Sequence, residues 1–210
     1  MIHVLIVDDH AIVRRGLKEI LADEYPEAVF GEVDDSRTAL QELARQEWDL
    51  MLLDINLPGR DGLELLQEAR RLHPGTRVLV VSAYPEEEFA VRSFKLGAAG
   101  YLAKSQAPDE LITAVTKILA GGRYVTAALA ERLVDDLVGD TALAPHELLS
   151  SRELQVLRMI ALGKTIKEIA AELALSEKTI ATYRARIAQK TGLSTNVALA
   201  RYAIQHGVVD

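Results

Sequence analysis

The first 125 residues alternate between short apolar runs and stretches with helical periodicity, and this alternation constrains the fold more than any other feature. The apolar runs are four or five residues long and lie at Val4–Val7, Val29–Val33, Leu50–Leu53, Val78–Val81 and Ala99–Leu102. After each run, apolar residues recur at spacings of three and four, which is the period of an amphipathic helix. Strands that alternate with helices form a parallel sheet with helices on both faces. We therefore predict an α/β domain over residues 1–125.

Residues 147–210 carry helix signals and no strand pattern. Two capping boxes, Ser150-Ser151-Arg152-Glu153 and Thr165-Ile166-Lys167-Glu168, each predict the start of a helix. Ser176 can cap a third helix, and Asn196–His206 has the pattern of a fourth. These signals predict a second, smaller all-α domain.

Residues 126–146 separate the two predicted domains. Within them, Thr126–Val138 has the apolar spacing of a short helix, and Gly139–Pro145 is typical of a turn or a flexible linker. The formal net charge of −7 is divided unequally: residues 1–125 carry −7, the linker −3 and residues 147–210 +3. An acidic chain repels DNA phosphates on average, but a basic C-terminal domain does not.

The chain contains no cysteine, which excludes disulfides, thiolate metal sites and a cysteine nucleophile. No apolar run approaches the ~20 residues that a helix needs to cross a membrane. The first nine residues are typical of a strand and lack the basic start of a signal peptide. We therefore expect a cytoplasmic protein that does not bind membranes. Surface or packing roles are expected for the scattered histidines, which are His3, His10, His73, His146 and His206.

Polar residues stand at or just past the carboxyl ends of four predicted strands: Asp8, Asp9, Asp54, Ser82 and Lys104. The carboxyl ends of parallel strands meet along one edge of the sheet, so we expect these side chains to converge there. Three carboxylates repel one another unless a cation neutralises them, and Mg²⁺ suits such a site because it prefers oxygen ligands. A lysine and a hydroxyl can contact the oxygens of a phosphoryl group. A carboxylate can itself accept that group, giving an acyl phosphate.

Segments around these residues resemble the receiver domain of two-component response regulators: Val7-Asp8-Asp9-His10, Leu53–Gly62, Val81-Ser82-Ala83 and Gly100–Lys104. The stretch from Leu149 to Ile180 is similar to the helix-turn-helix of the NarL/FixJ (LuxR-type) subfamily. The resemblance implies a flavodoxin-like (βα)5 receiver over residues 1–125, a linker helix and flexible linker over 126–146, and a LuxR-type DNA-binding domain over 147–210.

The same resemblance implies roles for the acidic residues. Asp54 would accept a phosphoryl group from a histidine kinase. Asp9, Asp54 and the carbonyl of Asn56 would bind Mg²⁺ directly, and Asp8 would act mostly through water.

Residues around the acids would contact the phosphoryl group or respond to it. Ser82 and Lys104 would contact its oxygens. Tyr101 would be the switch residue and would turn inward as Ser82 moves to the phosphate. Asn56 and Tyr84 lie where the family tunes the access of water, and hence the lifetime of the phosphate.

Lys178–Lys190 contains basic residues and no acidic one, which is typical of a helix that enters a DNA groove. The candidate DNA contacts are Lys178, Thr179, Ala181, Thr182, Arg184, Ala185, Arg186, Gln189 and Lys190. By the resemblance, Ala181, Thr182 and Ala185 occupy base-reading positions, and none of them can make a bidentate contact. We expect sequence readout to rest on Thr182, Gln189, methyl contacts and DNA shape.

The leading hypothesis is a phosphorylation-controlled transcription regulator, with no enzyme activity beyond self-phosphorylation from phosphodonors and slow autodephosphorylation. We expect a histidine kinase and double-stranded DNA as partners, and a homodimer in the phosphorylated state. The acidic receiver either covers the basic helix when unphosphorylated or supplies a dimer face when phosphorylated.

Two alternatives stay open. One is a receiver that is regulated by protein contacts without phosphorylation. The other is an aspartyl-nucleophile phosphatase of the haloacid dehalogenase type. That family has Asp-x-Asp after its first strand, whereas Asp54-Ile55-Asn56 lacks the second acid and follows the third strand.

Overall fold

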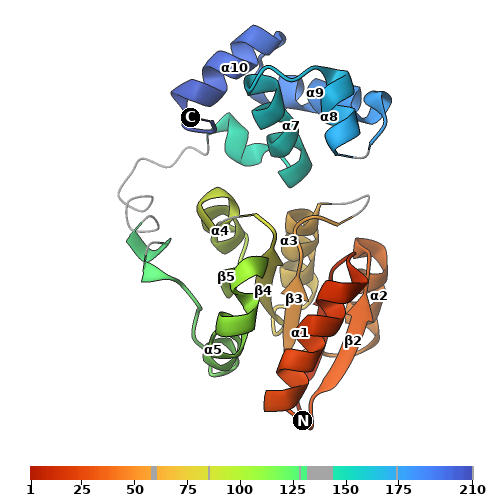
Figure 1. Cartoon of the computed structure of the whole chain (residues 1–210). Coiled ribbons are helices and arrows are strands. Elements are labelled where there is room, and N and C mark those ends of the chain that lie inside the picture. Colours follow the sequence, from red (N-terminus) through yellow and green to blue (C-terminus); the bar gives the residue numbers. More distant parts are fainter. Residues whose placement is uncertain (58–60, 85, 128, 132–143, 174, 210) are drawn as a thin grey trace. The chain divides into compact units, whose positions relative to one another are not determined.

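The computed structural model describes residues 1–57, 61–84, 86–127, 129–131, 144–173 and 175–209. The chain divides into two compact units, Met1–Thr141 and Ala142–Asp210, and each is described by itself (Figure 1). The predicted linker segments Thr126–Val138 and Gly139–Pro145 lie largely outside the described residues. The predicted boundaries between domains and linker therefore stay predictions.

The first unit is built on a parallel sheet with the strand order β2-β1-β3-β4-β5. Its strands are β1 (His3–Val7), β2 (Val29–Val33), β3 (Leu50–Leu53), β4 (Arg77–Ser82) and β5 (Gly100–Ala103). Each coincides with a predicted apolar run to within about two residues. The flavodoxin-like fold predicted for this part of the chain is confirmed.

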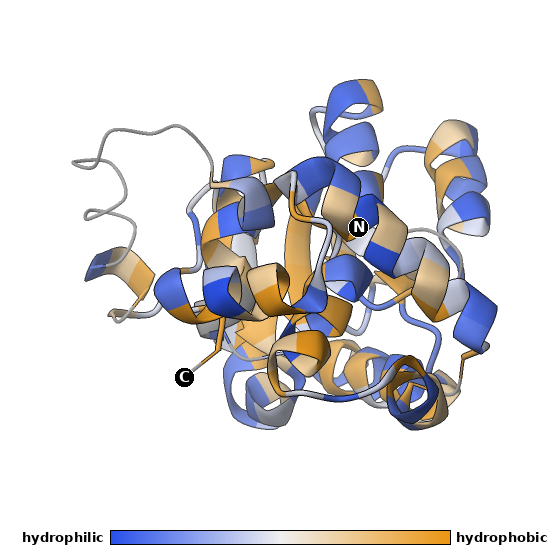
Figure 2. Ribbon diagram, turned by 90° about the horizontal axis from the view of Figure 1, so that it is seen from above, coloured by the Kyte–Doolittle hydropathy of each residue, from blue (hydrophilic) through white to orange (hydrophobic). Residues whose placement is uncertain are grey.

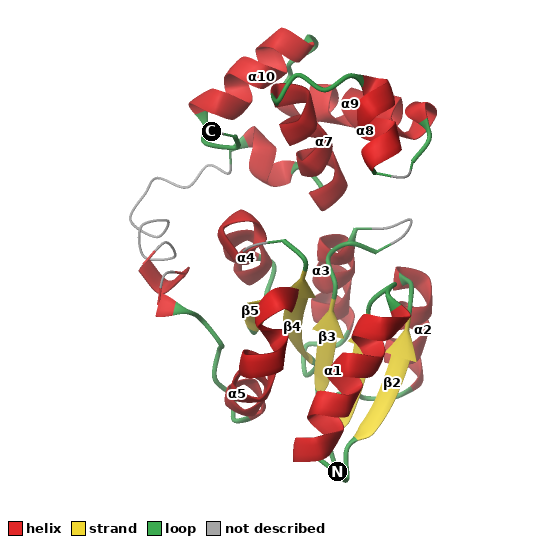
Figure 3. Cartoon of the chain, viewed as in Figure 1, coloured by secondary structure: helices red, strands yellow, loops and turns green. Residues whose placement is uncertain are grey.

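Helices cover both faces of this sheet (Figure 3). On one face lie α1 (Ala11–Glu24) and α5 (Ala107–Leu119). On the other face lie α2 (Ser36–Arg45), α3 (Gly62–Leu72) and α4 (Glu86–Lys95). A short 3-10 helix, η1 (Lys104–Gln106), joins β5 to α5. All four residues of β3 are buried, as expected for a central strand between two helical layers. The helices are hydrophobic on part of their surface and hydrophilic on the rest, as Figure 2 shows.

The strand order changes direction between β1 and β3. The chain leaves β1 toward β2 on one side and leaves β3 toward β4 on the other, which opens a crevice at the carboxyl ends of these two strands. Val7 pairs with Leu53, and the N–H of Asp54 donates to the Val7 carbonyl over 2.8 Å. The register therefore sets Asp8 and Asp54 side by side.

The start of α3 lies close against the strand end that carries Asp54. The Asp61 carboxylate caps the helix by accepting the N–H of Leu63 over 2.8 Å. A Cβ atom on Gly62 would stand 2.3 Å from the Asp54 carbonyl oxygen and 2.6 Å from Cα of Ile55. Only glycine permits this approach, so Gly62 fixes how the loop returns to the sheet.

The chain after α5 folds back onto the edge of the sheet. Tyr124 forms a parallel bridge with Gly100, its ring joins the core, and its hydroxyl donates to Glu110 over 2.7 Å. The hydroxyl of Thr126 then donates to Glu86, the first residue of α4, over 2.6 Å. Burial raises the pKa of Tyr124, and the neighbouring Glu110 adds to the effect.

The second unit is all-α, as predicted. Its elements are η2 (Pro145–Leu148), α7 (Ser151–Ala161), α8 (Ile166–Glu172), α9 (Glu177–Thr191) and α10 (Asn196–Gln205). Ser150 and Thr165 form the two predicted capping boxes, and Ser176 caps α9. Gly192 ends α9 with a φ of 72°, a left-handed conformation that favours glycine. The core of this unit includes Val156, Leu157, Ile169, Ile180, Ile187, Leu199 and Ala203.

Within the described residues, no helix is both long and apolar enough to span a membrane.

Candidate functional site

Side chains from three strand ends meet in the crevice of the first unit. The Lys104 ammonium, which follows β5, lies 2.6 Å from Oδ2 of Asp8 and 2.8 Å from Oδ2 of Asp54. Both carboxylates are buried, with Asp8 1% and Asp54 2% exposed. Two buried acids beside each other require a positive charge, and Lys104 provides it.

Burial and charge act on this group in opposite directions. Burial raises the pKa of Asp54, and the Lys104 ammonium offsets part of that effect. Burial disfavours the charged form of Lys104 and lowers its pKa. The carboxylates of Asp54 and Asp8 together have the larger effect, so that the pKa of Lys104 is raised overall. Lys104 is therefore cationic at neutral pH and places a fixed positive charge beside Asp54.

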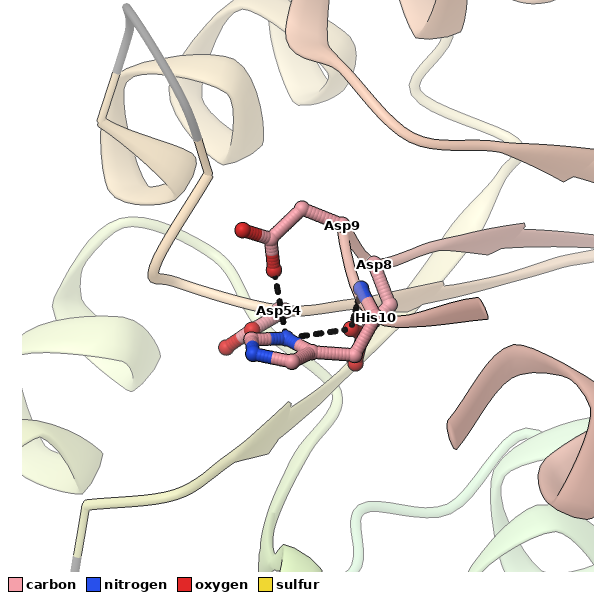
Figure 4. Close-up of side chains that lie close together, drawn as sticks. All are labelled: Asp8, Asp9, His10 and Asp54. Atoms are coloured by element: carbon pink, nitrogen blue, oxygen red, sulfur yellow. Dashed lines mark hydrogen bonds and ion pairs between the residues drawn. The ribbon is translucent and has the colours of Figure 1, made fainter. Parts of the chain in front are cut away.

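Asp9 and His10 complete a cluster of possible metal ligands with Asp8 and Asp54 (Figure 4). Nδ1 of His10 lies 2.6 Å from Oδ1 of Asp9. The backbone N–H of His10 donates to Oδ1 of Asp8 over 2.8 Å. One potential ligand atom from each of the four residues lies within 4.8 Å of the others. Sequence reasoning gave His10 a surface or packing role, although its position directly after two strand-end acids was a signal for the cluster.

The remaining predicted pocket residues surround this cluster. The N–H of Asn56 donates to Oδ1 of Asp54 over 3.1 Å. Ser82 is buried at the end of β4, where its Oγ accepts the N–H of Tyr84 over 3.2 Å. Tyr101 is 1% exposed, and its hydroxyl donates to the Tyr84 carbonyl over 2.9 Å. The structure thus holds Tyr101 in the inward orientation and joins it to Ser82 through the backbone of Tyr84.

In the second unit, α8 and α9 pack together, and α9 exposes the predicted small and polar face. The exposed members of the predicted set are Lys178, Ala181, Thr182, Ala185, Arg186, Gln189 and Lys190, whereas Thr179 and Arg184 are half-buried. Ile180 and Ile187 point to the core. The face that can enter a groove is therefore distinct from the face that holds the helix in the domain.

Two basic side chains of α9 have partners inside the domain. Arg184 donates to Oδ1 of Asn196 over 2.8 Å and to the carbonyl of Ser194 over 2.9 Å. Lys190 forms an ion pair of 2.6 Å with Glu153, which is 2% exposed. From the sequence, Arg184 and Lys190 were predicted only as DNA contacts. Their partners lie outside α9, and no local sequence pattern indicates such distant contacts.

Comparisons with known proteins agree with both units. The family model "Response regulator receiver domain" matches residues 4–116, and the model "Bacterial regulatory proteins, luxR family" matches residues 147–203. The response regulator GacA of Pseudomonas viridiflava is 37% identical over 211 residues, which cover 100% of this chain and 99% of GacA.

Solved structures of RcsB have a similar architecture. RcsB from Salmonella enterica serovar Typhimurium, bound to the promoter rprA in the presence of the phosphomimetic BeF3⁻, is 26% identical with a TM-score of 0.58. That comparison covers 96% of this chain and 98% of RcsB. A structure of two RcsB dimers bound to two parallel DNAs is 25% identical with a TM-score of 0.60. That comparison covers 97% of this chain and 98% of the RcsB chain. The chain therefore belongs to the response regulators of two-component systems, in the NarL/FixJ subfamily with a LuxR-type DNA-binding domain.

Proposed function

We propose that the protein is a cytoplasmic transcription regulator whose binding to double-stranded DNA is controlled by phosphorylation of Asp54. The phosphoryl donor is a sensor histidine kinase. The observation that carries this proposal is the pair of buried carboxylates, Asp8 and Asp54, held by the Lys104 ammonium. Such a pocket contains the nucleophile and the positive charge that phosphoryl transfer needs.

In the proposed transfer, a carboxylate oxygen of Asp54 attacks the phosphorus atom of a phosphohistidine. A P–O bond forms and the P–N bond breaks, and its electron pair stays with the histidine nitrogen. The charge on the phosphoryl oxygens then faces Lys104, whose Nζ lies 2.8 Å from Oδ2 of Asp54. Ser82 accepts the N–H of Tyr84 and keeps its own proton for a phosphoryl oxygen.

The acidic cluster fits a magnesium ion. Asp8, Asp9 and Asp54 supply hard oxygen ligands, and the cluster is compact enough for one cation. We assign Asp9, Asp54 and the carbonyl of Asn56 as direct ligands, with Asp8 acting mostly through water. When bound, Mg²⁺ would offset the negative charge of the carboxylates and of the phosphoryl group.

The contacts around Tyr84 suggest how the phosphate is sensed. A phosphoryl group adds a charge of about −1.5 to −2 beside Lys104. Ser82 would move toward it and change its hydrogen bond with Tyr84, and the inward orientation that Tyr101 already has is the one that the phosphorylated state would keep. Tyr101 is therefore the proposed switch residue. Tyr84 and Asn56 would control the access of water, and hence the slow autodephosphorylation that ends the signal.

On the DNA side, we assign Lys178 and Arg186 to phosphates and the rest of the predicted α9 set to the major groove or its edges. One such domain makes few phosphate contacts, so we propose a homodimer on paired half-sites in the phosphorylated state. The RcsB structure with dimers on DNA supports this assembly. Phosphorylation would act through dimerisation and through release of the basic helix from the acidic receiver.

Acetyl phosphate provides a direct test. The full chain, incubated with acetyl phosphate and Mg²⁺, should gain one phosphoryl mass by intact mass spectrometry, and Asp54→Ala should gain none. Asp35→Ala removes an acid outside the pocket and should be labelled like the wild type. The same donor should tighten the binding of wild type to a duplex DNA pool and should leave Asp54→Ala unchanged.

Other results would separate the alternatives. Equal labelling of wild type and Asp54→Ala would show that another residue accepts the group. An unlabelled wild type whose DNA binding responds only to a protein partner would indicate a receiver regulated by contacts. Turnover of a generic phosphate ester would indicate a phosphatase.

A further inference from the structure

The middle of the exposed face of α9 consists of small, methyl-bearing side chains. Ala181, Thr182 and Ala185 are exposed and lie at spacings of one, three and four residues, so they form one patch on the helix. The Thr182 hydroxyl donates to the carbonyl of Lys178 over 3.0 Å. Its proton is therefore used inside the helix, and the side chain offers a methyl group and an acceptor lone pair to a partner.

The longer polar side chains of α9 are held by the domain or stand at the ends of this patch, apart from the exposed Arg186 beside Ala185, which we assign to a DNA phosphate. Arg184 is bound to Asn196 and Ser194, and Lys190 to Glu153. Lys178 lies one turn before the patch and Gln189 one turn after it. Within the patch itself, Ala181, Thr182 and Ala185 cannot donate the two hydrogen bonds with which arginine or asparagine reads guanine or adenine.

We propose that α9 recognises the C5 methyl groups of thymines at the centre of its DNA half-site, through the methyl groups of Ala181, Thr182 and Ala185. This inference rests on the proposed function, in which α9 enters the major groove. Thymine is the base that displays an apolar group there, and small apolar side chains pack against it. Short side chains also allow the helix backbone to approach the bases closely.

Uracil in place of thymine tests this contact, because uracil lacks the methyl group and keeps the same base-pairing edge. The full chain, treated with acetyl phosphate and Mg²⁺, first selects duplexes from a random DNA pool. The selected half-sites should contain adjacent thymines at their centre. Replacing one of them by uracil should weaken binding about fourfold, as expected for the loss of one buried methyl-sized group. The slope of affinity against salt should not change, since no phosphate contact is lost.

Thr182→Ser supplies a matched variant. Serine keeps the hydroxyl that bonds the Lys178 carbonyl and removes only the methyl group. The variant should bind the selected thymine duplex more weakly than wild type, and uracil at the thymine facing residue 182 should cause no further loss. Circular dichroism checks that the variant keeps its helices.

The outcomes separate this inference from the proposed function. One contrary outcome is that uracil replaces each thymine of the half-site without weakening binding, while Gln189→Ala abolishes sequence preference. In that case readout rests on hydrogen bonds and the inference is wrong. Selection of half-sites without central thymines would overturn it as well. If neither the treated nor the untreated chain selects any duplex, the proposed DNA binding fails, and the inference fails with it.

Discussion

Nζ of Lys190 on α9 lies 2.6 Å from Oε2 of Glu153 on α7. The same carboxylate oxygen accepts the N–H of Ser150 over 2.8 Å in the capping box that starts α7. The side chain of Glu153 is buried, whereas that of Lys190 is 36% exposed. One carboxylate therefore connects the start of α7 to the last turn of α9, and it holds the proposed recognition helix in place.

Lys190→Ala should destabilise the C-terminal domain by about 2 kcal/mol, because it leaves the buried Glu153 carboxylate without a positive partner. Hydrogen exchange of the α9 amides in the full chain measures this loss. Lys178→Ala is the matched control, because the Lys178 side chain lies on the same helix and makes no hydrogen bond to any described residue. Equal protection in the two variants would contradict the structural role of Lys190.

Arg186→Ala should weaken DNA binding and flatten its salt dependence. Arg186 is exposed on α9 and has no partner among the described residues, so its charge is available to a phosphate. Each subunit of the proposed homodimer loses one phosphate contact, so the slope of log affinity against log salt should fall by about 1.8. Arg186→Lys keeps the charge and should keep the slope. A slope that is unchanged in Arg186→Ala would argue against the phosphate contact.

Gly62→Ala should destabilise the receiver by about 2 kcal/mol and displace Asp54. The added Cβ would stand 2.3 Å from the Asp54 carbonyl, and neither backbone can give way cheaply. Urea unfolding followed by the fluorescence of Trp48, the one tryptophan in the chain, measures the change in the receiver. A Cβ atom added at Gly16 in α1 would meet no atom within 4 Å. Gly16→Ala should therefore leave the stability unchanged or raise it slightly. A Gly62→Ala receiver as stable as wild type would refute the tight approach.

The stability of α2 should depend on pH through its N-cap, Asp35. Hydrogen bonds from the hydroxyl and the N–H of Thr38 lower the pKa of Asp35 below its ordinary 3.8. A carboxylate whose pKa is lowered by folding stabilises the fold fully at pH values above its ordinary pKa. This contribution is lost as the pH falls through the lower pKa of the folded state. Asp35→Ala should therefore cost about 1 kcal/mol near pH 7, and the difference from wild type should shrink below pH about 4.

Trp48 fluorescence during urea unfolding reports this change, because the indole N–H donates to the carbonyl of Glu42 in α2. Asp34→Ala is the control, since that neighbouring exposed acid makes no hydrogen bond to the described residues. A cost for Asp35→Ala that stays constant down to pH 2 would contradict the assignment.

Much of the fold could be predicted because its signals are local. A buried strand such as Leu50–Leu53 is a continuous apolar run, and a capping box such as Ser150 with Glu153 is complete within four residues. The convergence of Asp8, Asp54 and Lys104 was also predictable, because parallel strands bring their carboxyl ends to one edge.

Contacts between distant segments could not be predicted in the same way. The bond from Lys190 to Glu153 spans 37 positions, and nothing in the periodicity of α9 marks it. The return of Tyr124 to the sheet edge is a single bridge without a strand pattern around it. The inward orientation of Tyr101 is likewise a matter of rotamer and packing, which spacing alone does not specify.

The bridge between Tyr124 and Gly100 sets the length of the smallest autonomous receiver. The match to the receiver family ends at residue 116, eight positions before Tyr124. A chain cut there would lose the last turn of α5, with Ile118, and the Tyr124 ring, and the apolar edge around Gly100 and Leu79 would face water. Such a fragment would aggregate on the side where β5 is exposed, whereas a fragment that reaches Thr126 would keep that edge covered.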